Sequence, residues 1–94
     1  MTAELEGKDS LRIDKWLWHA RFCKTRAIAQ THASGGRIRL NGQRIEKPGT
    51  RVKPGDIVTL IAGRDVVVVR ILGLGVRRGP ASEAQSLYEM IEDA

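Results

Sequence analysis

The first apolar pattern in the chain has the spacing of an amphipathic helix that begins near residue 13. Four apolar positions follow the i, i+3, i+4, i+7 rule and would form one buried stripe: Ile13, Trp16, Leu17 and Ala20. Asp9 or Ser10 is a candidate N-cap for this helix. Trp18 falls on another face, where it would pack against the C-terminal helix or stack on an unpaired base.

A second helix is predicted over residues 26–34. Thr25 is a favourable N-cap, and the glycine pair at 35–36 ends the helix because glycine accepts a left-handed conformation without steric cost. The candidates for its inner face are Ile28 or Ala29, with Ala33.

Alternating and β-branched runs after residue 36 predict a small antiparallel sheet. Residues 37–40 alternate polar and apolar side chains. Asn41-Gly42 follows them and is a strong hairpin signal, because both turn residues must accept a positive φ. Further strands are expected over residues 43–46, 57–61 and 66–72, the last as a central strand.

A final helix is predicted after Pro80. Ser82 and Gln85 have the spacing of a capping box. The apolar face of this helix would be formed by Ala84, Leu87, Tyr88 and Ile91. The predicted fold class is therefore α+β, with two N-terminal helices, a small antiparallel sheet and a C-terminal helix. We expect a polar tail over 1–10, one domain over 11–80 and the closing helix over 81–94.

The charge of the chain is concentrated in one block. Its 94 residues carry a formal net charge of +5, but residues 12–53 hold eleven cations and two anions, whereas 1–11 sum to −2 and 81–94 to −4. Seven of the cations fall between residues 12 and 42, against the single acid Asp14. Asp14 would orient a neighbouring cation or interact with the first helical turn rather than bind a metal. This asymmetry favours a local polyanionic partner, and RNA is the first candidate.

Several function classes have no support in the sequence. Cys23 is the only cysteine, so no intramolecular disulfide can form, and no zinc-site spacing is present. His19 and His32 lack the spacing of an acid–base pair, and we expect neither an enzyme nor a cofactor or metal. No signal-peptide pattern or membrane-spanning run occurs, which indicates a cytoplasmic protein with no membrane partner. The oligomeric state stays open, with a monomer favoured.

The candidate RNA-binding residues lie in three consecutive elements. Arg21, Lys24 and Arg26 bracket the junction of the two helices, where Thr25 presents the positive end of the second helix. We expect these three cations to be exposed. Asn41 is ambiguous, because its role in the turn would explain it without RNA. The full set of candidates is Arg12, Lys15, Arg21, Lys24, Thr25, Arg26, Arg37, Asn41, Gln43 and Arg44.

These residues carry a resemblance to a known family. The string RIDKWL, then KTR before a second helix, then G-x-I-x-L-N-G resembles the S4-type RNA-binding domain over residues 11–56. That resemblance implies an S4-like (alpha-L) fold, in which two helices and the following hairpin form the RNA-binding surface.

The longer strings RIDKWLWHARFCKTRAIA, NGQR and RRGPASEAQSLYE are similar to the heat shock protein 15 family. This narrower resemblance implies a non-catalytic, ribosome-associated bacterial protein of the stress response. It would bind ribosomal RNA on the large subunit with nascent chain-tRNA, in recycling or rescue. Members of that family continue into a basic C-terminal extension, whereas this sequence ends at residues 92–94, EDA. The resemblance therefore implies RNA binding more strongly than ribosome affinity. The alternatives are an adaptor that acts through protein contacts of the acidic helix and, more weakly supported, an RNA-modifying enzyme.

Overall fold

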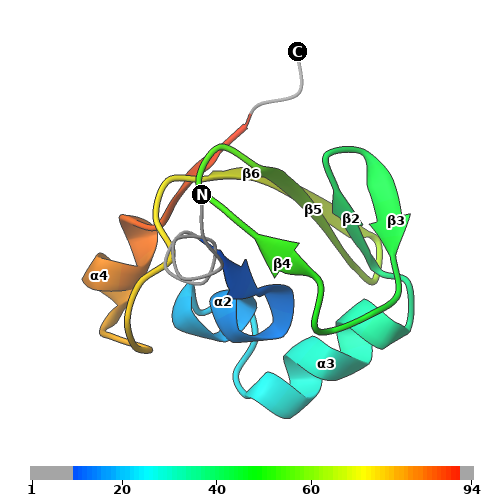
Figure 1. The fold of residues 1–94 in the computed structure, drawn as a ribbon, viewed down its shortest axis with the longest axis horizontal. Coiled ribbons are helices and arrows are strands. Elements are labelled where there is room, and N and C mark those ends of the chain that lie inside the picture. The colour runs from blue at the N-terminus through cyan, green and yellow to red at the C-terminus, as the bar shows by residue number, and fades with distance from the viewer. Residues whose placement is uncertain (1–9, 92–94) are drawn as a thin grey trace, which may run out of the picture.

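The computed structural model describes residues 10–91 and places helices on one side of an antiparallel sheet (Figure 1). The elements in chain order are β1 (Leu11–Arg12), α2 (Ile13–His19), α3 (Arg26–Ser34), β2 (Ile38–Leu40), β3 (Gln43–Ile45), β4 (Arg51–Val52), β5 (Ile57–Ala62), β6 (Asp65–Ile71), α4 (Ala81–Gln85) and β7 (Tyr88–Met90). The α+β class is confirmed. No helix within the described range is long and apolar enough to cross a membrane.

Helix α2 buries the stripe that its spacing predicts. Ile13, Trp16 and Leu17 are fully buried. The predicted cap is wrong: the N-cap is Arg12, whose side chain makes no capping hydrogen bond, and Asp9 lies outside the described residues. Carbonyl groups of the turn before β4 take over this role, since the N–H of Ile13 donates to the Thr50 carbonyl at 2.8 Å.

Helix α3 begins and ends at the predicted residues. The Thr25 hydroxyl accepts a hydrogen bond from the Ile28 N–H at 3.1 Å, which confirms the N-cap. Ala29 and Ala33 form the buried face, whereas Ile28 is 41% exposed, so the choice between Ile28 and Ala29 is settled for Ala29. Small residues on this face let α3 lie close to α2.

Within residues 10–91, the main sheet has five strands in the order β3-β2-β5-β6-β7, and every neighbouring pair is antiparallel. Asn41 and Gly42 have φ of 53° and 86°, which confirms the predicted hairpin turn. Ile38 lies opposite Leu60 on the buried face, and Val58 lies opposite Val69. These side chains form one cluster with the α2 stripe.

The predicted C-terminal helix is present only in part, because α4 ends at Gln85. The capping box is also wrong, since Pro80 is the N-cap and no side chain caps α4. The chain then turns into β7, which pairs with β6 in the register Val69 to Met90. Without β7, the backbone groups along one edge of β6 would have no hydrogen-bond partners. The hydrogen bonds gained by pairing with β6 outweigh the local helical tendency of this segment. β6 is central as predicted, and residues 92–94 lie outside the described range.

Candidate nucleic-acid interface

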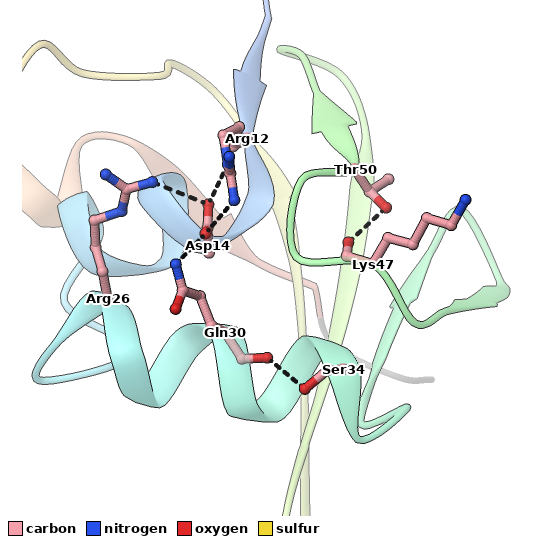
Figure 2. A network of polar contacts seen from close by, with 7 residues as sticks. All are labelled: Arg12, Asp14, Arg26, Gln30, Ser34, Lys47 and Thr50. Atoms are coloured by element: carbon pink, nitrogen blue, oxygen red, sulfur yellow. Dashed lines mark hydrogen bonds and ion pairs between the residues drawn. The ribbon is translucent and has the colours of Figure 1, made fainter.

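A buried carboxylate joins two of the predicted RNA-binding residues (Figure 2). The Asp14 side chain is fully buried, and Arg12 donates to both of its oxygens, from Nε at 3.1 Å and from Nη2 at 3.0 Å. Arg26 Nη2 lies 3.6 Å from Oδ1, and Gln30 Nε2 donates to Oδ2 at 3.1 Å. Asp14 therefore orients its neighbouring cations, as the sequence predicts. Arg12 and Arg26 remain 44% and 40% exposed.

The polar surroundings of two buried aspartates keep both ionised. Burial alone would raise the pKa of Asp14, but hydrogen bonds from Arg12 and Gln30 outweigh it, and the net effect is a lowered pKa. Burial alone would also raise the pKa of Asp56. Its carboxylate accepts hydrogen bonds from the Asn41 side chain and the Lys53 N–H, and the net effect is again a lowered pKa. Each carboxylate is thus held as an anion by specific donors.

Acid should destabilise this fold through the two aspartates. Both pKa values are lower in the folded chain than in the unfolded chain, where the pKa of aspartate is about 3.9. Their contribution is therefore present above about pH 4 and is lost as the pH falls through the folded pKa. We expect urea midpoints to decrease below about pH 4. Asp56→Asn should show a smaller decrease over that range than the wild type, and an equal decrease would contradict this assignment.

Some of the predicted RNA-binding residues at the junction between α2 and α3 make contacts that support the fold. Arg21 has a φ of 65°, and its Nε donates to the Gly79 carbonyl at 2.7 Å, although the residue is exposed. Lys24 is exposed with no hydrogen bond or ion pair within residues 10–91, and it directly precedes the Thr25 cap. The expectation of exposure is confirmed for Arg21 and Lys24, whereas Arg26 is half-buried. Of the three cations at this junction, Lys24 therefore contributes least to holding the fold together.

Asn41 has a structural role that explains it without RNA. Its Oδ1 accepts from the Ile57 N–H at 2.9 Å, and its Nδ2 donates to Asp56 at 3.2 Å. Its left-handed backbone serves the hairpin turn. The turn is therefore a sufficient cause for this residue, and its contact with RNA stays a prediction.

The remaining candidates lie on α2, before β2 and on β3. Arg44 lies opposite Arg39 in the register of β2 and β3. Because Ile38 is buried and side chains alternate along a strand, Arg39 faces away from the core. Arg44 also lies 3.2 Å from Glu46, which offsets its charge. Arg37 and Gln43 are exposed, and Lys15 is half-buried. The structure thus brings Arg12 and Arg26 together at Asp14 and places Lys24 and Thr25 before α3, whereas the ion pair of Arg44 is with Glu46.

Three side chains of the α2 region fasten a distant loop, a contact that sequence reasoning missed. Trp16 Nε1 donates to the Gly73 carbonyl at 2.9 Å, and His19 Nδ1 lies 3.1 Å from the Leu74 carbonyl. With the Arg21 bond to Gly79, these contacts bring the Arg77-Arg78 segment beside the helix junction. The adjacent arginines were the available signal, but nothing local shows where they lie.

Most of the aromatic residues, together with Cys23, lie in or against the hydrophobic core. Trp16 is fully buried as predicted. The ring centroid of Phe22 lies 5.9 Å from that of Trp16 and 4.6 Å from that of Tyr88. Trp18 is half-buried, and its ring centroid is 5.7 Å from that of His19. Burial raises the pKa of the Cys23 thiol. Among the described residues, no group of His, Cys, Asp and Glu could hold a metal ion.

Comparison with known proteins identifies the family. A model of the S4 domain matches residues 11–58. The chain belongs to the S4 domain family. The resemblance to heat shock protein 15 is also confirmed. A homolog of that protein from Aeromonas salmonicida is 44% identical over 93% of this chain and 65% of its own length. Heat shock protein 15 of Escherichia coli is 47% identical over 84% of this chain and 59% of its own length.

The similarity extends over a larger share of two further relatives. An RQC P-site tRNA stabilizing factor of Listeria monocytogenes is 34% identical over 89% of both chains. A solved trimeric structure of heat shock protein 15 from Vibrio cholerae superposes with a TM-score of 0.82 at 42% identity, covering 88% of this chain and 83% of that one. The S4-like fold is thereby confirmed. The chain spans less than two thirds of the length of the first two relatives.

Proposed function

We propose that this chain is a non-catalytic protein that binds structured RNA through the helical face of its S4 domain. The observation that carries the proposal is the cationic group around α3. Arg12 and Arg26 share the Asp14 carboxylate, and exposed Lys24 precedes the capped N-terminus of the helix. Guanidinium and ammonium groups, and the N–H groups at a helix N-terminus, each match the charge and geometry of phosphate oxygens.

The preferred partner is ribosomal RNA of the large subunit that carries nascent chain-tRNA. Support comes from the relatives, one of which is named for stabilising a P-site tRNA. A domain of this size neutralises only a few phosphates, so selective binding to one particle requires a matching RNA shape. Recycling or rescue of such subunits, in the cytoplasm, would be the consequence.

The structure weakens the adaptor alternative that rested on an acidic C-terminal helix. Glu83 lies 3.0 Å from Arg77, and Glu89 is paired with Arg70. Both carboxylates are therefore offset by cations, and the helix that would present them together is broken. A pull-down before and after RNase treatment separates the two functions: partners lost after RNase support RNA binding, whereas partners retained support an adaptor.

Binding should depend strongly on salt. With about five phosphate contacts, counterion release gives a slope of log Kd against log salt concentration of about 3 to 5. Fluorescence anisotropy with a labelled ribosomal RNA hairpin between 50 and 300 mM KCl, values chosen to span roughly the physiological range, measures this slope. A slope near zero would indicate base or protein contacts instead. Duplex DNA of equal length should compete more weakly, because the 2′-hydroxyls and wide minor groove of RNA are absent.

Sedimentation tests the ribosomal part of the proposal. We expect the chain to co-sediment with isolated large subunits, preferentially those that carry peptidyl-tRNA, and poorly with intact translating ribosomes. A basic C-terminal extension should tighten this binding chiefly at low salt, where charges are least screened. Co-sedimentation with small subunits only would contradict the large-subunit assignment and leave RNA binding intact.

A further inference from the structure

We propose that Asp14 is a positioning residue, which sets the guanidinium groups of Arg12 and Arg26 side by side so that together they bind one RNA phosphate. This inference rests on the proposed function and names how its central contact is assembled. The two arginines come from different elements, β1 and α3, and meet at the Asp14 carboxylate (Figure 2).

The geometry leaves binding capacity on both arginines. Arg12 uses Nε and Nη2 on the carboxylate, so its Nη1 group and one further N–H remain available. Arg26 approaches Oδ1 through Nη2 at 3.6 Å and keeps Nη1. Because Nε of Arg12 and Nη2 of Arg26 both lie beside Oδ1, the two guanidinium groups are neighbours. A phosphate accepts from two such groups at once.

Burial makes Asp14 a rigid anchor. Its side chain has no exposed surface, and a third donor, Gln30, occupies Oδ2 at 3.1 Å. The Asp14 N–H donates to the Pro48 carbonyl at 3.3 Å, which ties its backbone to the turn before β4. Long arginine side chains lose much rotamer freedom on binding, and a carboxylate that holds them beforehand removes part of that cost.

An acid on an RNA-binding surface has two opposing effects on affinity. Its negative charge repels phosphate, so neutralising it should tighten binding if charge alone mattered. Its hold on Arg12 and Arg26 favours binding, so neutralising it should weaken binding if positioning dominates. The sign of the change in Kd for Asp14→Asn therefore distinguishes positioning from charge repulsion, and an unchanged melting temperature distinguishes it from a purely structural acid.

The test measures binding of the full chain to the labelled ribosomal RNA hairpin by fluorescence anisotropy. We expect Asp14→Asn to raise Kd by about 10-fold. The slope of log Kd against log salt concentration should fall by about 1, the contribution of one phosphate contact. The matched control is Asp65→Asn, which removes the same charge at an exposed residue of β6 and should leave Kd unchanged or slightly lower. Tighter binding by Asp14→Asn, or an unchanged Kd, would overturn the proposal.

A second variant keeps the proposal testable if Asp14→Asn fails to fold. Gln30 is exposed, and Gln30→Ala removes one support of the carboxylate without changing any charge. We expect Kd to rise about 2- to 5-fold at an unchanged far-UV spectrum, within the range of one lost hydrogen bond. An unchanged Kd would count against positioning. If the wild-type chain itself fails to bind the hairpin, the proposed function fails rather than this inference.

Discussion

Lys24→Glu should weaken RNA binding by about 10- to 100-fold while the melting temperature stays within a few degrees of the wild type. The side chain is exposed and makes no hydrogen bond or ion pair within the part of the chain that the structure describes. The variant loses one charge-assisted phosphate contact and places an anion beside the N-terminus of α3, where phosphate would bind. Anisotropy and thermal melting measure both quantities on the same sample.

Arg39→Glu is the matched control, because it makes the same change in charge on β2, on the face of the sheet away from the core. We expect its effect on Kd to be several-fold smaller than that of Lys24→Glu. Equal losses would mean that RNA responds to net charge rather than to the helical face. A large fall in melting temperature for Lys24→Glu would instead mean that this lysine has a structural role.

Trp16→Ala is expected to lower the free energy of unfolding by about 3–5 kcal/mol. The indole is fully buried in the cluster between helix and sheet, and its N–H holds the Gly73 carbonyl at 2.9 Å. In a domain whose whole stability is of the order of 5–15 kcal/mol, that loss should lower the melting temperature by roughly 15 °C or more. Urea unfolding followed by circular dichroism gives the free energy.

Trp16→Phe separates packing from hydrogen bonding. It keeps an aromatic ring against Phe22 but removes the donor to Gly73, so we expect a loss of about 1–3 kcal/mol. Losses of similar size for the two variants would show that the hydrogen bond matters more than the packing of the ring. A loss below about 1 kcal/mol for Trp16→Ala would contradict the assignment of Trp16 to the core.

The elements that depend on neighbours in sequence were predictable. Thr25 caps α3 with its own hydroxyl, and Asn41-Gly42 closes the hairpin through its own backbone, so each signal and its effect lie within four residues. The α2 stripe follows in the same way from the spacing of Ile13, Trp16 and Leu17.

The parts that depend on distant partners were not predictable. The segment 86–91 has a helical apolar pattern, but pairing with β6 makes Tyr88–Met90 a strand. Asp14 was expected to orient a cation, yet its meeting with Arg26 and Gln30 requires the packing of α3 on α2. The docking of Gly73 on Trp16 joins residues 57 positions apart, which no local pattern encodes.

The loop that Trp16, His19 and Arg21 fasten has a consequence for how this module can be transplanted between proteins. The segment that the family model matches ends at residue 58, within β5, whereas side chains of α2 reach carbonyl groups at 73 and 74, and Arg21, just after α2, reaches the carbonyl at 79. A fragment cut at 58 would expose buried Trp16 and His19 to water and leave β5 without its partner β6. Chimeric constructions that borrow this RNA-binding unit should therefore carry the chain through β7.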